Sequence, residues 1–272
     1  MLWDLENVKN RVKIVNIIKA AYYKLICSMW FLLSLPYHQF YYITYTRINN
    51  IYRGDLMFNL KPETFDFNTV KGISKNQLDE HYKLYAGYVS KLNEIWNIPY
   101  TPSNYTDSNA TYSKMRSLKL GETYSLNGVK LHNLYFENMT GGSNTPYGPV
   151  LNAITSQFSS YKDFVSHLTN VGMSMRGWAV LSIDLIDNRL HIIGSDSHDT
   201  GAVWLSYPIL IMDVYEHAYF MDFGTDKKKY ISTFIENINW SILNNRFEEY
   251  ISLIKHMGMN QYRYYPYDFF NR

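Results

Sequence analysis

The stretch YPILIMDVYEHAY, residues 207–219, joins an apolar run to a carboxylate, Asp213, and to an imidazole, His217, four residues later. A carboxylate or an imidazole that leaves water needs a polar partner, and a metal cation is one of the few partners that satisfy both. On spacing alone, a hydrogen bond across one face of a helix is the commoner explanation. The pair therefore indicates a metal site only if other parts of the chain supply further ligands.

The composition is that of a folded protein, because the chain has 272 residues and 46% of them are hydrophobic. Residues 1–56 hold seven Lys and Arg against three Asp and Glu, a net charge of +4, which leaves −2 for residues 57–272. The folded part is not basic, so nucleic acid is not an expected partner. The single cysteine, Cys27, excludes an intrachain disulfide and favours a reducing, cytoplasmic setting. A metal must therefore be bound by nitrogen and oxygen ligands.

The first 56 residues differ from the rest of the chain. Residues 25–45 contain no Lys, Arg, Asp or Glu, and five lysines and arginines precede them, which is the order typical of a membrane anchor. Pro36 would interrupt a helix near the middle of this segment. The alternative is that residues 1–56 are not part of the mature protein and that Met57 is its start. A membrane is a partner, through residues 25–45, only if these residues are retained.

Two helices joined by a long loop are predicted in residues 57–142. From Ser74, a plausible cap, apolar residues recur at three, four and seven positions as far as Trp96. Residues 97–118 are rich in Asn, Ser, Thr and Pro and are predicted mostly as loop, and helical spacing returns in TYSLNGVKLHNLYFENM, residues 123–139. We expect these two helices to form an antiparallel hairpin, the first domain of the folded part.

Residues 143–272 have a mixed pattern. Two helices are predicted at 145–158 and 159–173, and the alternating stretches WAVLSIDL and RLHIIGSD flank Asp187-Asn188, a two-residue hairpin signal. AVWLSYPILIMDV supplies a third strand, helices are predicted at 228–238 and 239–257, and an aromatic tail follows. The predicted fold class is α+β, with an N-terminal antiparallel helical hairpin followed by a domain of helices around a three-stranded antiparallel sheet.

Three separate elements each carry a histidine in apolar surroundings. His81 lies on the first predicted helix, His132 on the second, and His217 just beyond the third strand. Together with Asp213 they make a set of three imidazoles and one carboxylate, which suits a redox-active iron or manganese ion.

Four blocks of the sequence carry a resemblance to the iron/manganese superoxide dismutase family. They are HYKLYAGYVSKLN at 81–93, HNLYFENMTGG at 132–142, GWAVL at 177–181 and DVYEHAYFMDFG at 213–224, in the family's order. The resemblance covers most of residues 74–240 and not the first 56 residues or the tail. It implies that the metal ligands are His81, His132, Asp213 and His217. It also implies that Tyr88 gates the substrate funnel and that Trp178 lines the metal pocket.

The chain departs from the family pattern at several positions near this site. His81 and Tyr88 are seven residues apart, where the family usually has eight, which leaves the pocket wall near Tyr88 open to question. The family's glutamine, which binds the solvent ligand of the metal, would fall on Gly128 or in SDSHD, where His198 stands and can act as a donor instead. The family's second-shell histidine and its tyrosine partner are replaced by apolar or aromatic residues at 84 or 85 and at 220.

The resemblance implies an enzyme, a superoxide dismutase that converts superoxide to oxygen and hydrogen peroxide with one manganese or iron ion per subunit. Glu216 is retained, and in the family this glutamate orients the last ligand histidine of the partner subunit, which implies a homodimer with Glu216 at the interface. An alternative is a protein of this fold that binds metal or supports assembly without turnover. The replacement of the glutamine does not distinguish manganese from iron.

Overall fold

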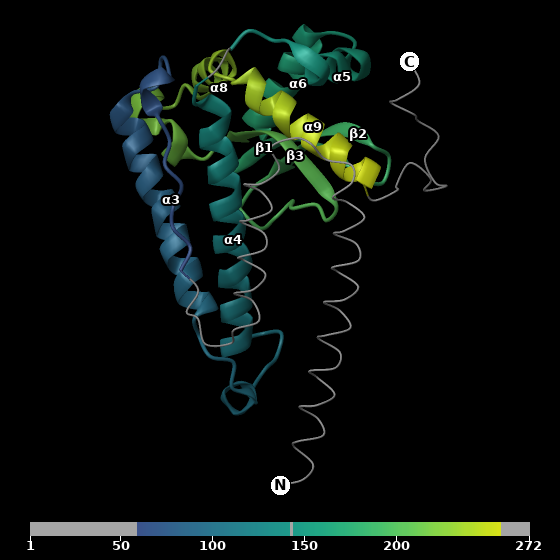
Figure 1. Ribbon diagram of the computed structural model, residues 1–272. Coiled ribbons are helices and arrows are strands. Elements are labelled where there is room, and N and C mark those ends of the chain that lie inside the picture. Colours follow the sequence, from purple (N-terminus) through teal and green to yellow (C-terminus); the bar gives the residue numbers. More distant parts are fainter. Residues whose placement is uncertain (1–58, 142–143, 257–272) are drawn as a thin grey trace, which may run out of the picture. The chain divides into compact units, whose positions relative to one another are not determined.

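The computed structural model describes residues 59–141 and 144–256 of the chain, and these residues belong to one compact unit, Phe58–Arg272 (Figure 1). The possible membrane segment at 25–45 and the aromatic tail lie outside the described residues. Among the helices that are described, none is both long and apolar enough to cross a membrane. The proposed division into domains at 57–142 and 143–272 stays a prediction.

The predicted helical hairpin is formed by α3, Lys75–Trp96, and α4, Lys114–Met139, which lie side by side (Figure 1). The Ser74 hydroxyl accepts a hydrogen bond from the backbone N–H of Gln77, an N-cap worth about 1 kcal/mol. The start of α4 was predicted wrongly, because the helix begins nine residues before Thr123. Ser113 caps it by accepting from the N–H of Arg116, and this cap, placed inside a polar stretch, starts the helix before its apolar spacing becomes visible.

The turn of chain before α3 and the loop after it contain two short 3-10 helices, η1, Phe67–Thr69, and η2, Pro102–Tyr105. Beyond α4, two helices lead into the sheet, α5, Gly148–Phe158, and α6, Tyr161–Ser174. Both lie close to their predicted positions.

The sheet contains β1, Trp178–Asp184, β2, Arg189–Ser195, and β3, Ser206–Asp213, in the order β2-β1-β3. Both pairings are antiparallel, so the predicted α+β fold with a three-stranded antiparallel sheet is confirmed. In the β1–β3 pairing Trp178 lies opposite Asp213 at one end of the sheet, and Asp184 lies opposite Ser206 at the other.

The β1–β2 turn has four residues, 185–188, and not the two that Asp187-Asn188 predicted, because Asp184 pairs with Arg189. Asn188 adopts a left-handed conformation, φ 53°, and donates its N–H to the Asp184 carbonyl over 2.8 Å. The carboxylates of Asp184 and Asp187 accept from the backbone N–H groups of Ile186 and Arg189. Aspartates that bond to the backbone two residues on stabilise such wider turns.

The chain continues after β3 through η3, Glu216–Ala218, and α7, Phe220–Phe223. It then forms α8, Lys227–Glu236, and α9, Trp240–His256. The buried Arg246 of α9 donates to the Ile209 carbonyl of β3 over 3.0 Å and to the Asn138 side chain of α4 over 2.5 Å. Helix α9 therefore ties α4 to the sheet.

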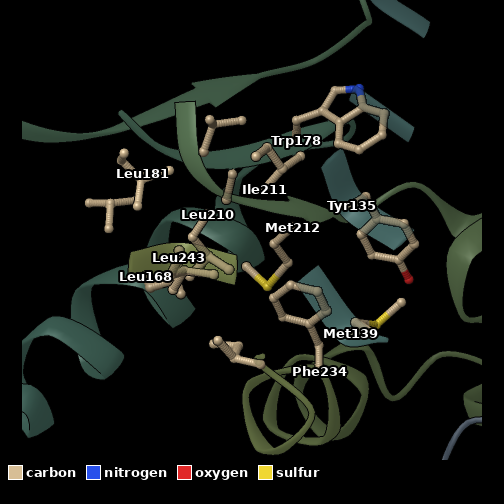
Figure 2. Packing of buried hydrophobic residues seen from close by; sticks show 14 of the residues in the cluster. Tyr135, Met139, Leu168, Trp178, Leu181, Leu210, Ile211, Met212, Phe234 and Leu243 are labelled. Carbon is tan, nitrogen blue, oxygen red and sulfur yellow. The ribbon is translucent and has the colours of Figure 1, made fainter. Parts of the chain in front are cut away.

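The hydrophobic core lies between the sheet and these helices. Figure 2 shows Tyr135 and Met139 of α4 and Phe234 of α8 packed beside Met212 and Ile211 of β3. All five side chains are buried. Because α4 and the end of β3 are held in this core, the polar residues that they carry next to it have fixed positions.

Candidate metal centre

The four predicted ligands come from four different elements and meet at one place. His81 lies on α3, His132 on α4, Asp213 is the last residue of β3, and His217 lies in η3. One nitrogen or oxygen atom from each lies within 4.8 Å of the others. Asp213 and His217 do not share a helix, so the simple explanation of their spacing as a helix-face pair is excluded.

The atoms that converge are the Nε2 atoms of the three imidazoles and a single carboxylate oxygen. Asp213 Oδ2 is 3.1 Å from His81 Nε2, 3.6 Å from His132 Nε2 and 3.3 Å from His217 Nε2. Two ligands that are each about 2.1 Å from a common cation are about 3.0 Å apart at a right angle and about 3.6 Å apart at 120°. The observed separations span this interval, so the donor set fits one ion.

His132 gives the clearest sign that a cation belongs between these residues. Its Nδ1 lies 2.6 Å from the Gly128 carbonyl oxygen, which can only accept, so the ring proton is on Nδ1. The unprotonated Nε2 is buried and has no hydrogen-bond partner in the described part of the chain. Its lone pair faces the Asp213 carboxylate, and two acceptors repel one another unless a positive charge lies between them.

Electrostatics keep Asp213 charged although it is completely buried. Burial by itself would raise the pKa of its carboxyl, but the neighbouring His217 and His81 hold that pKa well below the usual range. The second carboxylate oxygen, Oδ1, accepts from the N–H of Tyr215 over 2.9 Å, and the Tyr230 hydroxyl donates to the Asp213 carbonyl over 2.7 Å. The side chain is therefore both ionised and fixed in direction.

His198 lies in the loop between β2 and β3 and is buried, so it is not a loop residue facing water. The Trp178 indole N–H, which can only donate, bonds to His198 Nδ1 over 3.0 Å. Nε2 of the neutral ring therefore carries the proton, and this N–H has no acceptor among the described residues. Burial lowers the pKa of His198 to about 4, so the ring is neutral near pH 7. It is a free donor beside the metal ligands.

Tyr88 reaches the same cavity in spite of the short spacing from His81. Helix α3 is continuous through both residues, and the Tyr88 ring lies 4.8 Å from the ring of His198 and 5.4 Å from that of His132. A Cβ atom on Gly128 would lie only 3.0 Å from Tyr88 Cγ. The position where a glutamine was considered is therefore filled by the Tyr88 ring.

Three further residues shape the site and were missed in the sequence. Tyr124 of α4 lies 4.5 Å from the His198 ring, and Tyr215 stacks on His217 at 4.9 Å. Burial raises the pKa of Tyr88 and of Tyr215, and the Tyr124 phenol raises both further. Gln77, buried on α3, donates to the His217 carbonyl over 2.6 Å. Only the four-residue spacing of Gln77 from His81 and of Tyr124 from Gly128 could have indicated them.

One edge of the site faces outward. The His217 side chain is 24% exposed, and the neighbouring Glu216 is exposed and makes no hydrogen bond or ion pair that the described residues reveal. Leu84 and Phe220, which replace the family's polar pair, are exposed as well, whereas Tyr85 is buried. Position 84 is therefore the one at the surface.

The fold and this site define an α+β protein with a candidate metal centre of three histidines and one aspartate. Residues 146–246 match the family described as iron/manganese superoxide dismutases, C-terminal domain. An iron superoxide dismutase of Aquifex pyrophilus is 36% identical over 196 residues, which is 70% of this chain and 89% of that protein. A manganese superoxide dismutase of Halobacterium salinarum is 29% identical over 195 residues, 71% of this chain and 96% of that protein. The chain belongs to the iron/manganese superoxide dismutase family.

Proposed function

We propose that this protein is a superoxide dismutase that uses one manganese or iron ion held by His81, His132, Asp213 and His217. The observation that carries the proposal is the buried, unprotonated Nε2 of His132 facing the Asp213 carboxylate. Family membership supports the same activity, because relatives named as iron and as manganese enzymes both match most of the folded part. The site has only nitrogen and oxygen donors, which suit either metal.

The reaction consumes two superoxide ions and two protons and yields one oxygen molecule and one hydrogen peroxide. A bound manganese or iron ion supplies the electron chemistry by alternating between its trivalent and divalent states. Asp213 supplies a fixed negative charge that offsets part of the metal charge in a buried site. The three imidazoles bind through Nε2 while neutral, and burial keeps the pKa of His81 and His132 low.

Proton handling falls to the residues opposite the ligands. His198 holds its proton on Nε2, because Trp178 occupies Nδ1, and it can donate a hydrogen bond to solvent or to a small anion in the cavity. The Tyr88 hydroxyl, on the ring that packs against His198, can supply a second proton donor. Both groups are neutral near pH 7, so they bind an anion without adding charge to the site.

The proposal includes a homodimer with Glu216 at its interface. Glu216 is exposed beside the partly exposed His217, and the exposed Leu84 and Phe220 add apolar surface. A carboxylate from a second copy would fix the direction of the His217 ring, as outer-sphere carboxylates do for metal-bound histidines. We place the protein in the cytoplasm as an antioxidant enzyme, and a membrane tether through residues 25–45 is the alternative.

The test compares the purified full-length protein with a His132→Ala variant. We expect the wild type to contain one equivalent of manganese or iron and to consume superoxide, and the variant to lose both. His167→Ala, in which a half-buried histidine of α6 outside the site is removed, should change neither. Stoichiometric metal without superoxide consumption would favour the alternative of a metal-binding or assembly protein without turnover.

A further inference from the structure

An exposed apolar surface lies at the end of the sheet opposite the metal centre, where Asp184 pairs with Ser206. It is formed by large side chains from two loops and one helix, which we call the apolar edge: Ile186, Val203, Trp204, Leu205 and Leu253. Trp204 is 94% exposed, Leu205 73% and Ile186 66%. Single exposed apolar residues are common, but a contiguous group that includes a fully exposed tryptophan is typical of a surface that another segment covers.

The two loops of the apolar edge are joined to one another. The Leu185 N–H donates to the Leu205 carbonyl over 3.1 Å, which brings Ile186 close to Leu205. Leu205 has φ 61°, a left-handed conformation that a bulky side chain rarely adopts. The loop is thus held in a shape that turns its apolar side chains outward.

Helix α9 runs along β3 toward this same place. Arg246 bonds to Ile209, and further along the helix Glu249 and Tyr250 contact Tyr207. Four residues of helix advance about 6 Å, as far as two residues of strand. The last turn of α9, which includes Leu253, therefore reaches the level of residues 203–205, and the described chain ends at His256 beside the apolar edge.

The sixteen residues that follow His256 have the composition of a segment that packs on such a surface. Six of them are aromatic: Tyr262, Tyr264, Tyr265, Tyr267, Phe269 and Phe270. Aromatic side chains bury large areas while keeping a polar group for hydrogen bonding. The segment carries two arginines and one aspartate. The turn beside the apolar edge is acidic, since burial and the carboxylates of Asp184 and Asp187 raise the pKa of Tyr250 to about 12.

We propose that the C-terminal segment, residues 257–272, packs on the apolar edge of its own chain. Sixteen residues can span about 50 Å when extended, far more than the distance across this surface requires. Because the segment starts beside the apolar edge, its local concentration there is far above that of a free partner. This favours the chain's own tail over a second copy or another protein. The inference is independent of the metal centre and of the proposed activity.

Amide hydrogen exchange of the full-length protein, followed by mass spectrometry, tests the proposal. We expect amides in residues 259–272 to exchange at least about tenfold more slowly than in an unstructured chain. Trp204→Ser should abolish that protection. Tyr112→Ser is the matched control, because Tyr112 is an 85% exposed aromatic residue in the loop between α3 and α4, and it should leave the protection intact. Both replaced side chains are exposed, so neither variant should unfold the protein.

A chain that ends at His256 provides the reciprocal measurement. Amides in residues 201–206 should exchange faster in that chain, whereas those of residues 106–113 should not change. A chain that starts at Met57 should keep the protection of 201–206, which distinguishes the tail from the N-terminal segment as the occupant. The proposal is overturned if the tail of the wild type is unprotected, if Trp204→Ser leaves the protection unchanged, or if protection appears only at high protein concentration, which would indicate a second copy.

Discussion

The two sides of the metal centre are built in different ways. On the ligand side, formed by His81, His132, Asp213 and His217, the groups are fixed by bonds from four elements, and the Asp213 carboxylate is held by backbone as well as by side chains. The opposite side, which we call the aromatic wall, is formed by packed rings: Tyr88, Tyr124, Trp178, His198 and Tyr215.

Hydrogen bonding also separates the two sides. On the aromatic wall, His198 Nε2 and the Tyr215 hydroxyl are buried without a partner in the described residues. On the ligand side, the unpartnered Nε2 of His132 is an acceptor, which a cation satisfies. One side therefore offers lone pairs to a metal and the other offers protons to an anion or to water. Changes on the ligand side should remove the metal, and changes on the aromatic wall should alter the rate while the metal stays.

The largest effect is expected from Asp213→Asn. This change keeps the shape of the side chain and removes the only negative charge that the three imidazoles face, so metal affinity should fall at least about 100-fold and activity should be lost with it. Elemental analysis and a superoxide assay measure the two effects. Asp187→Asn is the control, because Asp187 bonds only to residues of its own turn and strand. Full metal content in Asp213→Asn would contradict the account.

A smaller effect is expected on the aromatic wall. Tyr88→Phe keeps the ring that packs on His132 and His198 and removes only the hydroxyl. Activity should fall about 10- to 100-fold while metal content is unchanged, because a proton donor is lost and no ligand is. Tyr112→Phe, at an exposed loop position, should have no effect. Loss of metal from Tyr88→Phe would show that the two sides are not separable.

The metal-free protein should lose stability in mild acid. Burial lowers the pKa of His198 in the folded state to about 4, from 6.5 when unfolded, and lowers those of His81 and His132 as well. The unfolded chain then binds more protons below about pH 6.5, so stability is full above that pH and is lost as the pH falls toward 4. We expect His198 to contribute about 1–2 kcal/mol of this loss between about pH 7.5 and pH 5. Urea unfolding at both values measures it, and in His198→Gln the loss should be smaller by that amount.

The smallest effect is expected where the aromatic wall rests on α4. In Gly128→Ala the new Cβ would lie 3.0 Å from Tyr88 Cγ and would push that ring out of place, so we expect a net loss of about 1 kcal/mol. Gly87→Ala is the matched control on α3, since nothing lies within 4 Å of its Cβ position. It should stabilise the protein by about 0.5–1 kcal/mol, because alanine is the better helix former. Thermal unfolding of both variants gives the comparison, and equal effects would show that Tyr88 is not packed on Gly128.

The ligand side could be predicted from the sequence for a physical reason. Each ligand sits within or at the end of a stretch with clear helical or alternating spacing, so its element was recognisable, and the residue types themselves limit the chemistry. His198 could be considered only through the family resemblance, and its burial and its bond to Trp178 came from the structure.

The rest of the aromatic wall could not be predicted because its residue type carries no signal in this chain. There are 26 tyrosines, and nothing in the spacing of Tyr215 separates a ring that stacks on His217 from one that packs in the core. The early start of α4 and the four-residue β1–β2 turn were missed for a similar reason. Both depend on side-chain bonds to the backbone, from Ser113, Asp184 and Asp187, which apolar periodicity does not report.

X-ray absorption at the metal edge of the purified full-length protein tests the central claim most directly. The account predicts one manganese or iron ion per chain, with three imidazole nitrogens and at least one oxygen at about 2.1 Å and no sulfur. The single-histidine variant His217→Ala should lose one nitrogen from that shell or lose the metal entirely. A metal with sulfur ligands, or a metal whose surroundings are unchanged in His217→Ala, would contradict the account.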